Sequence, residues 1–414
     1  MLLEGVRVVE LGVWVAGPSA GGVLADWGAD VVKVEPPAGD PFRNLFGSIG
    51  YASDLPNPPF ALDNRGKRSV VLDLRVPASR QVLDRLLQTA DVFLSNLRPD
   101  ALARLGLGHA ELTERHPRLV YASVTGYGLT GPDRDRPAYD VGAFWARTGI
   151  AHQLVPPGTP PPGIRGGLGD HTTGMTAVAG ICAALLDRER TGRGRVVEVS
   201  LLRTGMYCLG WDIGIHLQLG KVAPASPRHD SHTPLVNSYL AGDGRWVFLI
   251  GLEADRHFPG VARAVDRLEL IDDPRFAGAA ARRDNRAALI ALLDEIFATR
   301  PLDEWGGRFD AEDVWWCQVQ SPGEAADDPQ AVAAGAFVDV PAGDGASTFR
   351  AVNSPVHFHG APGDGAGPVG PVPALGEHTD EVLREVGLGD DEIDRLRRAG
   401  AIPAHAAVRD KEAR

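Results

Sequence analysis

The chain has 414 residues, of which 44% are hydrophobic and 23% are charged. This balance is typical of a soluble globular protein, and the length is typical of two or three domains. Lys and Arg number 42 against 54 Asp and Glu, which gives a formal net charge of −12. So acidic a chain is poorly suited to nucleic acid or to an anionic membrane surface, and we expect neither as a partner.

The cysteines and the N-terminus restrict the class of protein further. Cys182, Cys208 and Cys317 lie far apart, so the sequence offers neither a disulfide framework nor a CxxC metal site. No apolar run approaches the ~18 residues of a membrane span. Glu4 and Glu10 interrupt the apolar stretch that a signal peptide would need. We therefore expect a soluble, cytoplasmic protein.

The first 130 residues alternate short β-branched runs with helical patterns. Strands are predicted at 6–11, 30–35, 69–74, 91–97 and 119–125, and helices at 21–27, 77–90 and 100–116. Apolar strands that alternate with helices are typical of a parallel, doubly wound sheet. The strongest helical pattern covers 172–189, and the run VVEVSLL at 196–202 predicts one more strand. Two Pro/Gly-rich stretches, 36–66 and 153–169, are predicted to be long loops.

The pattern changes after about residue 220. A hairpin signal at 239–250 is followed by Arg- and Ala-rich helices to about 310. We therefore predict a large domain at 1–220 and a smaller α+β domain at 225–325. The remaining residues, 326–414, hold a Pro/Gly-rich linker at 361–376 and a final helical pattern around 379–399.

Two glycine motifs match known signatures, but their context favours a plainer interpretation. GPSAG at 17–21 matches the nucleophile elbow of hydrolases, yet only sixteen residues precede Gly17, too few for the earlier strand that supplies an oxyanion loop. We interpret it as a tight strand-to-helix turn near a ligand and not as a Ser19 nucleophile. GYGLTG at 126–131 matches a dinucleotide fingerprint, but Pro132 and Pro137 follow where a helix should open.

The histidines form no set of metal ligands. His357 and His359 alternate on a predicted strand and could share one face. Spacing supplies no third ligand, so we interpret them as surface or core histidines and predict no metal site.

Asp170 stands between a glycine-rich loop and the strongest helical pattern. One interpretation is a plain N-cap, since Asp is favoured there. The other gives the same geometry a function, because a helix dipole keeps a carboxylate ionised and an ionised carboxylate can be a covalent nucleophile. Gly166, Gly167 and Gly169 would then let a substrate carbonyl approach backbone N–H donors closely. The local sequence leaves both interpretations open.

Taken together, these segments resemble the family III CoA-transferases, the formyl-CoA and carnitine CoA-transferase group. The resemblance rests on the order of its pieces over most of the chain: Leu3–Pro18, Gly28–Arg43, Asn64–Leu74, Asp91–Gly106 and the GLGD segment that ends at Asp170. It implies a large doubly wound, Rossmann-like domain, a smaller domain and a C-terminal segment that returns to the large one. It also implies an interlocked homodimer, with Asp170 in the place of the family's nucleophile.

The resemblance implies a CoA ester as substrate and no permanently bound cofactor. The positions that match the family's CoA contacts are Val15, Ala16, Leu72, Arg75, Asn96, Leu97, Arg104 and Leu105. Pro36 and Pro137 stand where some members carry an arginine and a lysine, and we expect Arg43 and Arg136 to substitute, since guanidinium groups suit phosphates. Val15 replaces a glutamine that some members carry beside the active site.

The α-methylacyl-CoA racemases resemble the same stretch and keep the aspartate. Their second acid–base group is a histidine in a GHD motif, where this chain has Ala138, Tyr139 and Asp140. A tyrosine is a poor base at neutral pH. We therefore predict a CoA-transferase from an acyl-CoA donor to a carboxylic acid acceptor, with Tyr139 and Asp140 in the acyl pocket and aspartyl–acyl anhydride and aspartyl-CoA intermediates. A racemase and a non-catalytic CoA-binding protein remain as alternatives.

Overall fold

The computed structural model describes residues 1–50, 57–343, 346–360 and 369–402. The chain forms two compact units. The first, which we call the sheet unit, holds residues 1–151, 163–222 and 333–414, and the second, the small unit, holds 152–162 and 223–332. Within the described residues, no helix combines the length and the apolar character needed to cross a membrane.

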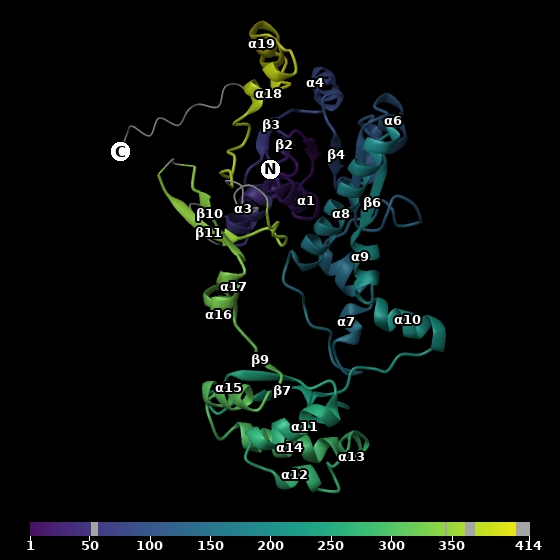
Figure 1. Cartoon of the computed structure of the whole chain (residues 1–414). Helices are drawn as coiled ribbons and strands as arrows, with labels where there is room; N and C mark the ends of the chain where they lie inside the picture. The colour runs from purple at the N-terminus through teal and green to yellow at the C-terminus, as the bar shows by residue number, and fades with distance from the viewer. Residues whose placement is uncertain (51–56, 344–345, 361–368, 403–414) are drawn as a thin grey trace. The chain divides into compact units, whose positions relative to one another are not determined.

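A six-stranded parallel sheet forms the centre of the sheet unit (Figure 1). Its strands are β1 (Arg7–Leu11), β2 (Asp30–Glu35), β3 (Arg68–Val71), β4 (Val92–Ser95), β5 (Val120–Thr125) and β6 (Val196–Ser200). They lie in the order β3-β2-β1-β4-β5-β6, which confirms the predicted doubly wound sheet. The direction of winding reverses between β1 and β4, and sheets of this kind bind ligands at the carboxyl ends of the strands beside that reversal.

Helices cover both faces of this sheet, which is why its strands read as nearly continuous apolar runs. Neighbouring residues on a strand face opposite sides, so Val9 lies in one hydrophobic core and Val8 in the other. One face packs against α1 (Ala16–Asp26) and α8 (Leu168–Thr191). The other packs against α4 (Pro77–Gln88), α5 (Pro99–Arg104) and α6 (His109–Arg115).

The C-terminal segment returns to the sheet unit, as predicted. Its helices α18 (Thr379–Glu385) and α19 (Asp390–Arg398) pack into the same core as α4 (Figure 1). The segment also bonds along the edge near β3, where Gly66 N–H donates to Pro371 O at 2.9 Å and Asp73 N–H donates to Ala401 O at 2.9 Å. An edge strand that would otherwise be open is therefore covered.

Shorter elements connect these layers. They are η1 (Pro41–Asn44), α2 (Leu45–Ser48), α3 (Pro58–Asn64), the π-helical η2 (Val141–Ala146), α7 (Ile150–Gln153), α9 (Leu201–Cys208), α10 (Gly210–Leu219) and an antiparallel hairpin of β10 (Phe337–Pro341) and β11 (Thr348–Val352). The described part of 36–66 is thus mostly helical, whereas a loop is predicted there. Part of the predicted linker at 361–376 lies outside the described residues.

The small unit is α+β, as predicted. Its antiparallel sheet comprises β7 (Val236–Leu240), β8 (Trp246–Ile250) and β9 (Trp316–Gln318). The unit also contains η3 (Arg228–Asp230), α11 (Ala254–Ala264), α12 (Glu269–Asp272), α13 (Ala279–Asp284), α14 (Arg286–Phe297), α15 (Leu302–Ala311), α16 (Pro322–Asp327) and α17 (Pro329–Ala333). Its core is aromatic, with Phe297, Trp305 and Phe309 fully buried.

Two helices begin earlier than predicted, and both differences bear on the site. Helix α1 begins at Ala16 and not at residue 21, because the glycines that mask its helical pattern allow close packing: a Cβ on Gly17 would lie 3.0 Å from the Asn96 side chain, and one on Gly22 would lie 2.9 Å from the backbone of Asp63. Ser19 is therefore inside a helix, buried, with its hydroxyl donating to Ala16 O at 3.0 Å. Helix α8 begins at Leu168 and not at residue 172. After β5, the GYGLTG segment leads to no helix before η2.

Candidate active site

Asp170 lies in the first turn of α8, and Gly167 is the residue that caps this helix. Gly167 has a φ of 95°, a conformation that glycine adopts without strain. Its N–H donates to Asp140 Oδ2 at 3.0 Å, and Asp140 Oδ1 accepts a 2.8 Å hydrogen bond from Val141 N–H. The buried Asp140 carboxylate therefore fastens η2 to the start of α8. Asp170 is not the N-cap that its sequence position favoured.

The carboxylate of Asp170 is half-buried and makes no hydrogen bond to any described residue. Burial and the negative charge of Asp140 raise the pKa of Asp170 to about 7, against the opposing effect of His171. A helix dipole alone would keep the group ionised, as expected from the sequence, but here burial and a like charge outweigh it. The result is a poorly solvated carboxylate that titrates near neutral pH, which is characteristic of functional sites.

Unbonded backbone donors belong to the same helical turn as this carboxylate. The N–H groups of Leu168, Gly169 and Asp170 belong to the first turn of α8 and find no acceptor among the described residues. Gly167 differs from the expectation, because Asp140 already accepts its N–H. Gly166 lies exposed before the helix. At Gly169 a Cβ would come within 2.6 Å of the Phe144 ring, so only glycine allows this close packing.

His171, the neighbour of Asp170, is paired with a buried carboxylate. Its Nε2 lies 3.0 Å from Asp63 Oδ1, and Asp63 on α3 is 2% exposed with no partner for Oδ2. Burial disfavours the charged imidazole, but the hydrogen bond and the charge of Asp63 outweigh it and raise the pKa of His171. A positive charge is therefore stabilised beside Asp170. The pair was not predicted, since 108 residues separate its members.

A pocket of about 600 Å³ opens at the carboxyl ends of β1, β2 and β3. Four of the predicted CoA contacts line it, namely Leu72, Arg75, Leu97 and Leu105. Arg80 on α4 also lines it and was not predicted, because nothing in the sequence distinguishes it from other helical arginines. The pocket is largely apolar with two guanidinium groups, so it could accept an apolar chain and an anionic group together.

Asn96 holds the turn after β1 by hydrogen bonds to its backbone and does not line this pocket. Its Oδ1 accepts from Val13 N–H at 3.0 Å and its Nδ2 donates to Val13 O at 2.7 Å. A Cβ on Gly17 would lie 3.0 Å from the Asn96 amide carbon, so the turn and α1 are packed directly on this side chain. Val15 and Ala16 lie where this turn becomes α1.

The remaining predicted arginines lie apart from the pocket lining. Arg43 is engaged inside the protein, since its Nη2 lies 2.6 Å from Glu35 and its Nη1 donates to Pro373 O at 3.0 Å. Arg104 is exposed at the end of α5, next to the lining residue Leu105, and forms no side-chain hydrogen bond or ion pair with any described residue. Arg136 is exposed, with its nearest carboxylate 3.8 Å away on Asp133.

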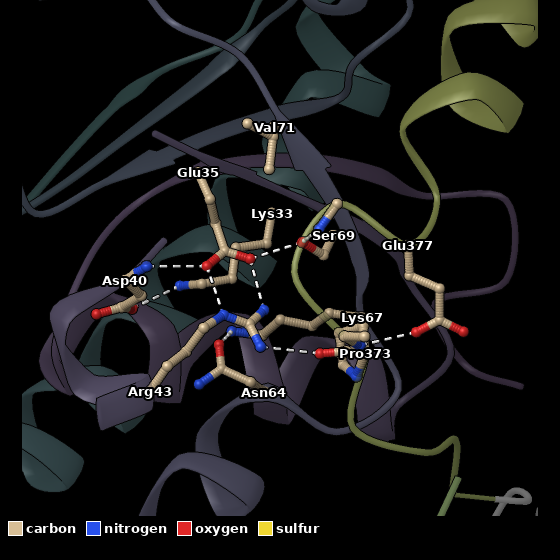
Figure 2. A network of polar contacts seen from close by, with 12 residues as sticks. Lys33, Glu35, Asp40, Arg43, Asn64, Lys67, Ser69, Val71, Pro373 and Glu377 are labelled. Carbon is tan, nitrogen blue, oxygen red and sulfur yellow. Dashed lines mark hydrogen bonds and ion pairs between the residues drawn. The ribbon is translucent and has the colours of Figure 1, made fainter. Parts of the chain in front are cut away.

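A fully buried set of charges adjoins the turn after β1, and Figure 2 shows Lys33, Asp40 and Lys67 of this set. Lys33 Nζ lies 3.0 Å from both Glu10 Oε1 and Asp40 Oδ2, and Lys67 Nζ lies 2.7 Å from Glu10 Oε2. None of these side chains is exposed. Burial lowers the pKa of Lys67 to about 8 although Glu10 opposes it. Lys33 also donates to Gly12 O at 3.1 Å, which links the charges to the turn itself.

The same set of charges reaches the pocket rim and the returning C-terminal segment through Glu35 (Figure 2). Glu35 accepts from Asp40 N–H at 3.0 Å and from the Ser69 hydroxyl at 2.6 Å. The Ser69 hydroxyl in turn accepts from Gly376 N–H at 2.8 Å. One buried carboxylate thus connects β2, β3 and the segment before α18.

The two predicted acyl-pocket residues differ in exposure. Asp140 is buried, whereas Tyr139 is 59% exposed. The ring of Tyr139 meets the indole of Trp14 edge-on, with centroids 5.7 Å apart at 90°. Trp14 was not singled out from the sequence, and its backbone φ of 65° is unusual for an aromatic residue.

His357 and His359 show no sign of a metal site. Their rings lie 4.5 Å apart, while Phe358 between them packs edge-on against Trp27. Within the ranges that the structure describes, no three His, Cys, Asp or Glu side chains are grouped as metal ligands.

Comparison with known proteins yields consistent matches. The profile of CoA-transferase family III matches residues 3–379. The (R)-2-hydroxy-4-methylpentanoate CoA-transferase of Clostridioides difficile is 33% identical over 96% of this chain and 98% of its own length. The cinnamoyl-CoA:phenyllactate CoA-transferase of Clostridium sporogenes is 35% identical over 95% and 96%. The crystal structure of a CAIB/BAIF family protein from Brucella suis superposes with a TM-score of 0.80 at 30% identity, covering 93% of this chain and 99% of that one.

Replacing Asp170 with asparagine is expected to stabilise the protein at alkaline pH. With a pKa of about 7 in the folded state and 3.8 ordinarily, the group binds its proton more tightly when folded, so wild-type stability falls as the pH rises from about 4 to about 7. Asparagine removes this cost, which is at most about 4 kcal/mol above pH 7. Urea unfolding of wild type and Asp170→Asn at pH 5 and pH 8 measures this cost. The variant should gain more free energy of unfolding over the wild type at pH 8 than at pH 5, and an equal gain at both pH values would contradict the prediction.

Proposed function

The chain belongs to CoA-transferase family III, and from this premise we propose that it moves coenzyme A from an acyl-CoA donor to a carboxylic acid by covalent catalysis at Asp170. The family membership makes the chain a CoA-transferase that acts on CoA thioesters. The aspartyl mechanism and the residues that follow are our proposal. The observation that carries it is the unbonded, half-buried Asp170 carboxylate among free N–H groups at the start of α8.

The proposed chemistry needs a carboxylate nucleophile and donors for an oxyanion. An ionised Asp170 oxygen attacks the thioester carbonyl, and the CoA thiolate leaves to give an aspartyl–acyl anhydride. The thiolate then attacks the aspartyl carbonyl, which releases the donor acid and leaves an aspartyl-CoA thioester. The acceptor carboxylate takes the same two steps in reverse. One thioester replaces another, so no further energy source is required.

Backbone N–H groups would stabilise each tetrahedral intermediate. Those of Leu168, Gly169 and Asp170 suit this role because no described residue accepts from them. One well-placed donor is worth ~3 kcal/mol to such a transition state. His171, held by Asp63, adds a positive charge that favours the ionised form of Asp170.

We place the coenzyme along the 600 Å³ pocket. Leu72, Leu97 and Leu105 supply apolar contacts, and Arg75 and Arg80 are the cations of the lining. Arg75 is paired with Asp73 at 2.7 Å, whereas Arg80 forms no ion pair with any described residue and is the better phosphate contact. Arg104 lies next to the lining residue Leu105, is exposed and has no ion pair among the described residues, so we retain it as a phosphate contact.

We further propose that two chains form the interlocked dimer that the resemblance implies. Helix α10 supports this, because none of its residues is buried although it carries several large apolar side chains. Trp211 is 83% exposed and Leu217 78%, and Tyr207 on the preceding helix is 87% exposed. Monomeric soluble proteins rarely expose contiguous apolar surface of this kind, and a second copy would cover it.

The first prediction tests the covalent step. Incubation of the enzyme with an acyl-CoA donor alone should leave acyl or CoA mass on the peptide that contains Asp170, and hydroxylamine should remove it. Asp170→Asn should carry no adduct and lose several orders of magnitude in turnover, since an amide is not a nucleophile at neutral pH. Peptide mass spectrometry is the measurement, with 3-methylbutanoyl-, 3-phenylpropanoyl-, acetyl- and succinyl-CoA as donors.

The adduct also separates a transferase from a racemase. A racemase would use the same aspartate for proton transfer, so loss of activity in Asp170→Asn fits both. Rapid exchange of the α-proton by wild-type enzyme that never carries a trapped adduct would contradict our proposal.

The second prediction concerns the coenzyme contacts. Arg80→Ala and Arg104→Ala should each raise KM for an acyl-CoA by about 5- to 50-fold with little change in kcat, because a phosphate contact is made equally in ground and transition states. Arg118→Ala, which removes an exposed arginine away from the pocket lining, is the control. Steady-state kinetics decides, and a fall in kcat at constant KM would assign these arginines another role.

The third prediction concerns assembly. Sedimentation velocity should give a dimer that persists at nanomolar concentration, because threaded chains separate only by unfolding. Trp211→Glu should reduce the yield of dimer by placing a charge in the apolar contact. A wild-type chain that is monomeric on dilution would disprove the interlocked arrangement.

A further inference from the structure

We propose that Trp14 and Tyr139 form an apolar wall for the acyl chain. The acids between which coenzyme A is exchanged would then be bulky apolar monocarboxylates, branched or aromatic, and not dicarboxylates. This inference rests on the proposed function, because it assigns a substrate class to the site around Asp170. Three features of the structure carry it: the backbone of Trp14, the position of the two rings, and the charges around Asp170.

The backbone of Trp14 is held in a conformation that tryptophan rarely adopts. Its φ is 65°, in the left-handed region that favours glycine, and such conformations persist only where the surroundings enforce them. The enforcing contact is a 3.0 Å hydrogen bond from Trp14 N–H to Asp40 Oδ1. Asp40 is itself fixed by the buried Lys33 at 3.0 Å. The protein thus maintains a strained turn that presents a large aromatic side chain.

The rings lie beside the helix start that carries Asp170. The indole of Trp14 contacts Tyr139 edge-on at 5.7 Å and lies 6.2 Å from the ring of Phe42. Tyr139 directly precedes Asp140, whose carboxylate holds Gly167 N–H at the start of α8. A ring that is 59% exposed there offers apolar area that a substrate could cover.

More apolar surface adjoins the aromatic pair. Val141, one residue after Asp140, is 49% exposed, and Leu168 in the first turn of α8 is 57% exposed. Val15 follows Trp14 directly and is half-buried. Exposed apolar side chains thus adjoin Asp140 and Asp170 along the chain, and apolar acyl chains gain free energy from covering such surface.

The charges around Asp170 disfavour a second carboxylate on the acyl chain. Asp140 and Asp63 both act on Asp170 as negative charges, and His171 is the opposing group. The imidazole of His171 is already paired with Asp63 at 3.0 Å. Arg43 is paired with Glu35 and Arg147 with Asp133, whereas the exposed Arg165, five residues before Asp170, forms no ion pair with any described residue. A second carboxylate held beside Asp170 would nevertheless add to the negative charges of Asp140 and Asp63.

The experiment measures exchange of isotopic label between an acyl-CoA and its own free acid, which requires no knowledge of the natural donor and acceptor. The panel comprises 3-phenylpropanoyl-, 3-methylbutanoyl-, acetyl- and succinyl-CoA, with the full-length protein. We expect kcat/KM for the two bulky apolar esters to exceed that for acetyl-CoA at least tenfold, and that for succinyl-CoA by more.

The key variant is Trp14→Gly, because glycine adopts a positive φ freely and keeps the turn and its bond to Asp40. It should lower the ratio of kcat/KM for 3-phenylpropanoyl-CoA to that for acetyl-CoA by roughly 10- to 100-fold, the usual range for lost apolar contacts in a pocket. Trp14→Phe should restore part of the ratio. Trp246→Ala, at a partly exposed tryptophan of the small unit, is the control and should leave the ratio unchanged.

Tyr139→Ala tests the same wall without altering the turn, and it should lower the same ratio. An unchanged ratio in both Trp14→Gly and Tyr139→Ala would overturn the inference, as would a wild-type preference for succinyl-CoA. In both cases label exchange itself would still occur, and the proposed function would stand. Absence of exchange with every ester, together with absence of an Asp170 adduct, would instead refute the proposed function and the inference with it.

Discussion

Lys33 has no contact with water, so its charge persists only beside the carboxylates of Glu10 and Asp40. Glu10 is shared with Lys67, which is equally buried. Removing one member would leave an unpaired charge in the interior, at a cost of about 3–5 kcal/mol. The chain around these groups therefore has little freedom: Gly12 and Pro18 give their carbonyls to the two lysines, at 3.1 and 2.8 Å. Buried charges thus fix the turn between β1 and α1 together with the hydrogen bonds and packing of Asn96.

This constraint reaches the candidate active site through close helix packing. Helix α1 begins at the fixed turn and lies against α8, where a Cβ on Gly174 would come within 2.1 Å of the Ser19 hydroxyl. Because the helices touch this closely, the direction of α1 determines where the first turn of α8 lies. Asp140 then holds that turn from the other side. The position of Asp170 thus depends on two contacts: the packing of α8 against α1, and the hydrogen bond from Gly167 N–H to Asp140.

The fold was largely predictable because its signals are local. The run Asp30–Glu35 is a strand from its first residue to its last, since a buried parallel strand is marked by its own β-branched residues. The start of α8 was not predictable, because Gly167 caps the helix through its left-handed backbone conformation and no side chain of the sequence indicates this cap. Asp170 was singled out from its loop, but the rise in its pKa comes from burial and from the charge of Asp140, which only the tertiary structure brings about. Arg80 was missed for the same reason.

The sheet unit is discontinuous in sequence, and this affects how it is made. Asp73, just after β3, donates its N–H to the carbonyl of Ala401, which is synthesised some 330 residues later. At 5–20 residues per second, a ribosome needs roughly 15–65 s to deliver that partner. During this time the core that Val382 and Ile393 will complete stays open, with an unpaired strand edge beside it. The nascent sheet unit therefore leaves apolar surface exposed for longer than the small unit, which is continuous over 223–332 and has nearly all its residues earlier.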